Sequence, residues 1–184
     1  MNPIDQLDAL IPTFTRLADQ VESDDLERPT PCTDWKVRDL LNHIAGGAPV
    51  FAGLFRGEEG RPFPDEDQLG DDASGAVRAA LDEFDVAVRS SGAMERTVDT
   101  PFGVMPGETF ARLAAFDLMV HSWDLATALR EPLELDDALV DEVDTFVRSA
   151  IPEERPPELF AAAVEPRSGA SRLECLVAFS GRRP

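Results

Sequence analysis

The sequence predicts an all-α protein: a four-helix bundle with a short hairpin and extra C-terminal helices. Its long segments repeat apolar residues every three or four positions, which is the spacing of helices that bury one face. Only residues 97–105 are patterned like a pair of short strands. The 184 residues show no internal repeat and suit one domain, so we expect a single domain over residues 1–184.

The first helix is expected from the N-terminus to about Val21. Asn2 is placed to cap it, and Pro3 fits its first turn. Pro12 lies inside the pattern and should kink the helix or delay its regular part.

The second helix is expected from Trp35 to about Arg56, capped by Thr33 or Asp34. Its apolar positions follow the helical spacing. Three residues should weaken or bend its middle, namely Gly46, Gly47 and Pro49.

The other elements follow after a loop over residues 57–72, which is rich in glycine, proline and acidic side chains. A third helix is expected over about 73–90, then a hairpin with its turn near residues 101–103. The fourth helix, 107–129, is apolar on most sides and should be central. A fifth is expected over 136–150, and a short last helix begins with the capping box Ser171–Glu174 and closes at Gly181.

The composition excludes several classes of partner. The formal net charge is −19, so nucleic acids and anionic membranes would be repelled. Two cysteines are too few for a disulfide framework. With neither a signal peptide nor a long apolar run in the sequence, we expect a cytoplasmic protein without membrane contact.

The two histidines are the residues most able to carry chemistry. Asp39 lies four positions before His43, Asp117 lies four before His121, and Asp124 follows three later. Residues with these spacings share one face of a helix, so the last three form a polar stripe on an apolar helix. Two facing helices of this kind could hold Zn²⁺, Ni²⁺, Fe²⁺ or Mn²⁺ in an open site. The alternative is an Asp–His hydrogen bond within each helix and no metal.

Three motifs are spread along most of the chain. They are PTPCTDWKVRDLLNH at residues 29–43, DLMVHSWDLA at 117–126 and LVAFSGRRP at 176–184, with ERTV at 95–98 and FGVMPG at 102–107 between them. In this order they resemble the DinB/YfiT-like metalloenzymes, in the branch of the N-terminal domain of mycothiol-dependent maleylpyruvate isomerase. The last motif also resembles a subfamily described only as metal-binding.

The resemblance implies a DinB-like bundle in which His43, Asp117 and His121 hold a divalent metal. It implies zinc first, with nickel, iron or manganese as alternatives. Asp117 stands where the isomerase has glutamate, so Asp124 could replace it as a ligand, and Asp39 could orient a metal-bound histidine. The metal would lower the pKa of a low-molecular-weight thiol, such as mycothiol or bacillithiol, for transfer to a small molecule or for isomerisation.

Three functions stay open at this point: a metal-dependent enzyme of the thiol-transferase or isomerase type, a metal- or ligand-binding module without catalysis, and a metal-free interaction protein. The isomerase has a second, C-terminal domain for which the tail here is too short, so maleylpyruvate isomerisation itself is not a safe inference. The family also suggests a homodimer.

Other notable residues are interpreted as structural. Trp35 and Trp123 are expected to be core anchors, and Cys175 a core residue. Cys32 could have a lowered pKa before a helix N-terminus, although a packing role is favoured. The sequence does not reveal whether the proline-rich segment 152–166 covers the site.

Overall fold

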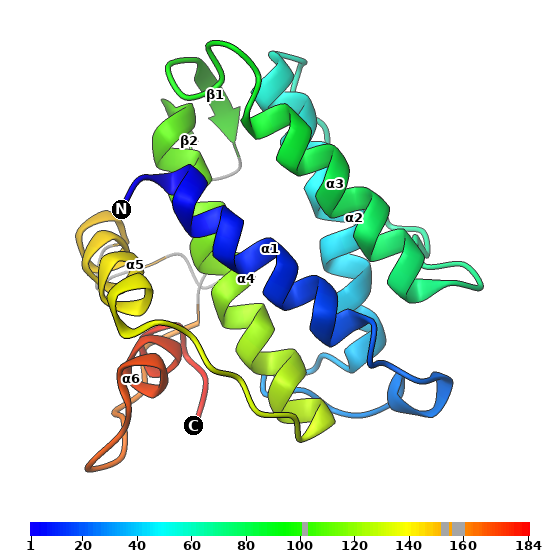
Figure 1. Cartoon of the computed structure of the whole chain (residues 1–184), viewed down its shortest axis with the longest axis vertical. Coiled ribbons are helices and arrows are strands. Elements are labelled where there is room, and N and C mark those ends of the chain that lie inside the picture. Colours follow the sequence, from blue (N-terminus) through cyan, green and yellow to red (C-terminus); the bar gives the residue numbers. More distant parts are fainter. Residues whose placement is uncertain (101–102, 152–154, 156–160) are drawn as a thin grey trace.

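Four helices form the bundle that the sequence predicts. The computed structural model describes residues 1–100, 103–151, 155 and 161–184 (Figure 1). The bundle helices are α1 (Pro3–Ala18), α2 (Val37–Arg56), α3 (Ala73–Val88) and α4 (Gly107–Leu129). Helix α1 packs against α3 and α4, and α2 packs against the same two helices, so the four close into a ring around one apolar core. The prediction of an all-α bundle is confirmed.

The remaining elements surround this bundle. They are a 3-10 turn, η1 (Ser23–Asp25), the strands β1 (Thr97–Thr100) and β2 (Gly103–Pro106), and the helices α5 (Asp137–Ala150) and α6 (Arg172–Phe179). The strands pair antiparallel as predicted, and part of the expected turn, residues 101–102, lies outside the described residues. Helix α5 packs on α4, and α6 packs on both, on the side away from α2 and α3 (Figure 1).

Local signals place most helix ends correctly. The Asn2 side chain accepts a hydrogen bond from the Asp5 backbone N–H at 3.0 Å, which caps α1 as predicted. Pro12 lies inside α1 without ending it, but the helix stops at Ala18, short of Val21. Helix α5 begins at Asp137, one residue after the expected start, with Asp136 as its N-cap, and the predicted capping box precedes α6.

The start of α2 corrects one prediction. Its N-cap is Lys36, and the Asp39 carboxylate accepts from the Lys36 backbone N–H at 2.8 Å. Neither Thr33 nor Asp34 caps the helix, because both belong to a turn before it. Within that turn Asp34 takes a left-handed conformation with φ 68°.

The glycines of α2 admit a neighbouring loop. The helix continues through Gly46, Gly47 and Pro49 to Arg56. A Cβ at Gly46 would lie 3.0 Å from Pro64, and one at Gly47 would lie 3.0 Å from the ring of Phe63. Small residues are therefore needed here because the loop over residues 57–72 rests directly on the helix.

Helix α4 lies at the centre, as its apolar sequence predicts. It packs on α1, α2, α5, α6 and both strands of the hairpin. Its first residue, Gly107, donates its N–H to the Arg96 carbonyl at 2.7 Å. No helix of the described residues is both long and apolar enough to cross a membrane.

Candidate metal centre

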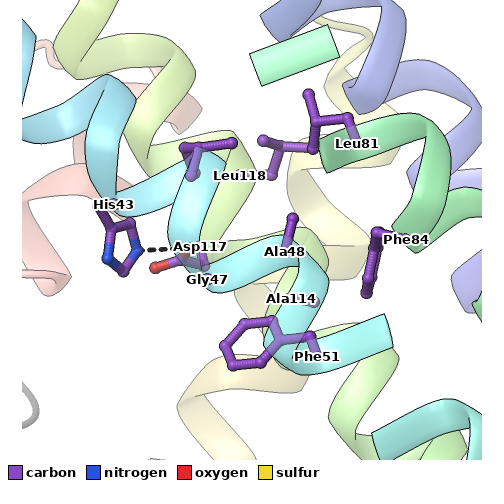
Figure 2. Close-up of a pocket in the computed structure, with 10 residues that line it drawn as sticks. His43, Gly47, Ala48, Phe51, Leu81, Phe84, Ala114, Asp117 and Leu118 are labelled. Carbon is purple, nitrogen blue, oxygen red and sulfur yellow. Dashed lines mark hydrogen bonds and ion pairs between the residues drawn. The ribbon is translucent and has the colours of Figure 1, made fainter. Parts of the chain in front are cut away.

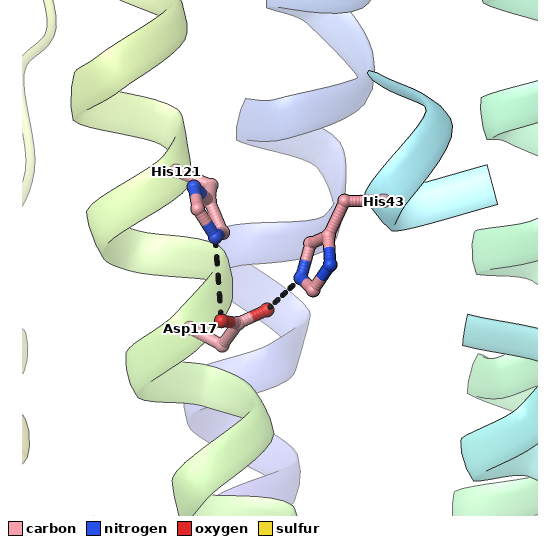
Figure 3. Close-up of side chains that lie close together, drawn as sticks. All are labelled: His43, Asp117 and His121. Carbon is pink, nitrogen blue, oxygen red and sulfur yellow. Dashed lines mark hydrogen bonds and ion pairs between the residues drawn. The ribbon is translucent and has the colours of Figure 1, made fainter. Parts of the chain in front are cut away.

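Three of the predicted site residues come together between α2 and α4. His43 lies on α2, while Asp117 and His121 lie one turn apart on α4 (Figure 3). Asp117 Oδ2 lies 3.3 Å from His43 Nε2, and Asp117 Oδ1 lies 3.4 Å from His121 Nε2. One ligand atom from each of the three residues lies within 4.8 Å of the other two. The carboxylate thus bridges two imidazoles from different helices.

The cluster is buried on one side and open on the other. The side chain of His121 is 6% exposed, that of His43 is 21% exposed and that of Asp117 is 38% exposed. A small molecule can therefore approach from the Asp117 side while α4 holds His121 in the interior.

The charges of the cluster depend on one another. Burial alone would raise the pKa of Asp117, but His121 and His43 outweigh it and hold that pKa well below its usual range. Burial alone would lower the pKa of His121, but Asp117 and Asp124 raise it to about 9. Without a cation, a proton on His121 therefore supplies the positive charge that the ionised Asp117 requires.

Asp124 and Asp39, the other two predicted site residues, have separate positions. Asp124 is fully buried, and its Oδ2 lies 3.0 Å from His121 Nδ1, the ring nitrogen that the cluster does not use. It is placed to orient His121. Asp39 is exposed and caps the start of α2 through the Lys36 N–H. The Asp39 carboxylate therefore contacts the Lys36 backbone, whereas the spacing suggested a contact with the His43 ring.

Trp35 is partly buried against the core, as expected, and it also lies against the cluster. Its ring stacks on His121 with centroids 5.5 Å apart and 13° between the planes, and it lies 5.1 Å from the His43 ring. The preceding turn puts it there: the Thr30 backbone N–H and hydroxyl both donate to the Trp35 carbonyl, each at 2.9 Å. Trp123 is partly buried against the core, as expected.

Two further residues contact the site and were missed. The Phe63 ring lies 5.6 Å from His43, and Arg182 Nη2 donates to Asp124 Oδ2 at 2.8 Å. Phe63 stands in a polar loop without periodicity, so no sequence signal marked it. Arg182 belongs to the third motif, at residues 176–184, and this motif was the sequence feature that could have identified it as a site residue.

The lowered pKa considered for Cys32 and the core position expected for Cys175 are both wrong, whereas the packing role favoured for Cys32 stays a prediction. Burial raises the pKa of the Cys32 thiol to about 11, and α2 begins only at Val37, too far on to lower it. Cys175 is half-buried on α6 and lies outside the core. Ser122 is buried and donates its hydroxyl to the Leu118 carbonyl at 2.7 Å, so it is occupied as a structural group.

A small cavity adjoins the cluster inside the bundle. His43 and Asp117 stand at its polar end (Figure 2). The other residues that line it are Ile44, Gly47, Ala48, Phe51, Leu81, Phe84, Ala114 and Leu118. The cavity is therefore apolar beyond the two candidate ligands.

The donor set fits a divalent cation. Two ligands about 2.0–2.1 Å from a tetrahedral zinc lie about 3.4 Å apart. Asp117 Oδ2 lies 3.3 Å from His43 Nε2 and Asp117 Oδ1 lies 3.4 Å from His121 Nε2. With one atom from each residue the three lie within 4.8 Å of one another, so the side chains would draw together around a bound ion. Two imidazoles and one carboxylate are also the ligand types of open zinc sites. The arrangement can thus hold a metal with a free position.

The fold and the cluster together define a class, a DinB-like helical bundle with a candidate metal centre between two helices. A DinB-like protein from Bacillus subtilis superposes with a TM-score of 0.55 at 14% identity, covering 73% of this chain and 95% of that one. The mycothiol-dependent maleylpyruvate isomerase structure superposes with a TM-score of 0.58 at 18% identity, covering 67% of this chain. This chain spans 59% of the length of that isomerase structure.

The family itself is shown by sequence. The family described as the mycothiol maleylpyruvate isomerase N-terminal domain matches residues 7–126. Two uncharacterised proteins of Mycobacterium tuberculosis, from strains CDC 1551 / Oshkosh and ATCC 25618 / H37Rv, are each 33% identical over 129 residues, covering 70% of this chain and 68% of theirs. The chain belongs to the mycothiol maleylpyruvate isomerase N-terminal domain family.

Proposed function

We propose that residues 1–184 form one metal-binding domain in which His43, Asp117 and His121 hold a divalent cation. Zinc is the first choice, with nickel, iron or manganese as alternatives. The observation that carries the proposal is the convergence of three ligand atoms, from two helices, within 4.8 Å of one another. A protonated His121 balances Asp117 in the free protein, and a cation would take over that role.

The proposed activity is that of a metal-dependent enzyme that activates a low-molecular-weight thiol, mycothiol or a similar one, for transfer or isomerisation. The family and the likeness to the mycothiol-dependent maleylpyruvate isomerase structure support the thiol. When bound, the cation would lower the pKa of a thiol beside it. Asp124 fixes the His121 ring, and Trp35 covers the two imidazoles and limits the access of water.

The lining of the apolar cavity indicates the chemical type of the electrophile that would react with the thiol. Apart from His43 and Asp117, its described lining carries no charged side chain. A cationic group that would balance a dicarboxylate is thus missing from this lining, and the cavity volume is only about 30 Å³. We therefore propose an electrophile of which only a small, uncharged, apolar part enters the cavity. A net charge of −19 would also disfavour polyanions.

A non-catalytic metal- or ligand-binding module is the second candidate. The observation in its favour is that the nearest polar side chains are already engaged. Ser122 donates to a backbone carbonyl, and Asp39 caps α2. Neither is free to act as a general base for a bound substrate.

Thiol consumption, together with thiol-dependent conversion of the electrophile, distinguishes the two candidates, because an isomerisation releases its thiol again. Protein loaded with Zn²⁺ is mixed with mycothiol, and in parallel with bacillithiol, against a panel of apolar and anionic electrophiles. We expect catalysed loss of thiol with an apolar electrophile, and at least about a hundredfold loss of rate in His121→Ala, because a missing metal removes the main stabilisation of the thiolate. Protein that carries metal yet neither consumes thiol nor converts any electrophile in a thiol-dependent way would contradict the enzyme and support the binding module.

A further inference from the structure

The chain after α6 turns back toward the candidate metal centre. Helix α6 ends at Phe179, and Gly181 follows with a left-handed φ of 94°. The Arg182 backbone N–H donates to the Val177 carbonyl at 3.0 Å. A Cβ at Gly181 would lie 2.5 Å from the Cβ of Ala161, so only glycine fits this turn without displacement. The turn fixes the direction in which Arg182 leaves the helix.

In the described part of the chain, Arg182 is the only residue outside α4 that forms an ion pair with Asp124. Its Nη2 donates to Asp124 Oδ2 at 2.8 Å, and its Nε lies 3.3 Å from both carboxylate oxygens. Its Nη1 donates to the Ser180 carbonyl at 3.3 Å, which restrains the guanidinium from the other side. The Arg182 side chain is 15% exposed and Asp124 is fully buried. A buried carboxylate requires such a partner.

The same carboxylate oxygen also contacts the candidate ligand. Asp124 Oδ2 accepts from Arg182 Nη2 and lies 3.0 Å from His121 Nδ1. A chain of contacts therefore runs from the C-terminal segment through Asp124 to the ring whose Nε2 faces Asp117. Removing Arg182 would leave Asp124 buried and free to rotate, and the orientation of the His121 ring would lose its support.

We infer that Arg182 is a positioning residue for the candidate metal centre, acting through Asp124 on His121. The inference rests on the proposed metal-binding function. The segment after α6 would thus help to orient a metal ligand, a role that the residues of the bundle helices do not fill alone. Outer partners of metal-bound histidines commonly change metal affinity by about 10–100-fold, and we expect an effect in that range.

The test compares Arg182→Met with Arg183→Met in the full chain. Arg183 is the next residue, is exposed, and gives a control with the same change in charge. Zn²⁺ affinity is measured by competition with a chromophoric chelator, and the visible spectrum of the Co²⁺-loaded protein reports ligand geometry. Arg182→Met should weaken Zn²⁺ binding about 10–100-fold and alter the Co²⁺ spectrum, whereas Arg183→Met should do neither.

Arg182→Lys keeps the charge without the paired donors of a guanidinium, so it should recover part of the affinity. If Arg182→Met fails to fold by circular dichroism, a second neutral variant, Arg182→Gln, decides: an affinity and a spectrum equal to those of the parent would overturn the inference. Parent-like binding by a folded Arg182→Met would overturn it too, and would leave the proposed function intact. A parent that binds neither Zn²⁺ nor Co²⁺ would refute the proposed function, and the inference with it.

Discussion

His121 is the residue on which the candidate site depends most. Its Nδ1 contacts Asp124 and its Nε2 faces Asp117, so both ring nitrogens have carboxylate partners. Trp35 covers one face of the ring. In the free protein this surrounding favours an imidazolium, and the same groups would orient a neutral imidazole toward a cation.

The metal-free protein should lose stability as the pH rises. The folded pKa of His121 is about 9, above its ordinary 6.5. Its contribution is therefore fully present below about pH 6.5 and is lost as the pH rises through 9. We expect the free energy of unfolding, measured by urea denaturation with chelator present, to fall by about 2–3 kcal/mol across this range.

The variant His121→Gln supplies the control for this prediction. It cannot take up a proton, so its free energy of unfolding should change little between pH 6.5 and 9. An equal fall in the parent and in the variant would assign the effect to other groups. A parent whose stability is constant over the range would contradict the account of the cluster given above.

At the scale of elements, hydrogen bonds between near neighbours were predictable and those between distant segments were not. The caps at Asn2 and Ser171 involve residues three positions apart, and both were predicted correctly. The start of α2 was placed too early, because the turn before it is held by bonds from Thr30 to Trp35. Propensity alone carries no information on that pairing.

The junction between β2 and α4 provides a test of packing at this scale. A Cβ at Gly107 would lie 2.0 Å from the backbone carbonyl oxygen of Ala93, which cannot rotate away. Gly107→Ala should therefore reduce the free energy of unfolding by at least about 2 kcal/mol, despite the better helix propensity of alanine. Thermal or urea unfolding measures the change.

Gly60→Ala is the matched control. Its Cβ would lie 3.4 Å from the Asp99 carbonyl oxygen, an ordinary contact. We expect it to change the free energy of unfolding by less than about 0.5 kcal/mol. If Gly107→Ala proved as harmless as this control, the close approach of α4 to the Ala93 carbonyl would be wrong.

For the whole molecule, helical periodicity was enough to predict the bundle, but it could not assemble the site. It put Asp117 and His121 on one face of a helix, because that spacing is local. His43 meets Asp117 across 74 positions of sequence, and Arg182 meets Asp124 across 58. The pairing of His43 with Asp117 was predicted from the resemblance of the motifs to a known family. The second, like the contact of Phe63 with His43, depends on how loops and the C-terminal segment fold back, which no periodicity encodes.

The central claim is that one cation binds between α2 and α4. It is tested most directly by mass-spectrometric metal analysis of untagged protein purified without chelator, beside His43→Ala, His121→Ala and the exposed control Arg183→Ala. The account predicts about one metal per chain in the parent and in the control, and loss of metal in both histidine variants. A parent that takes up no metal even after incubation with Zn²⁺, Ni²⁺, Mn²⁺ and Fe²⁺, or histidine variants that keep it, would contradict the account.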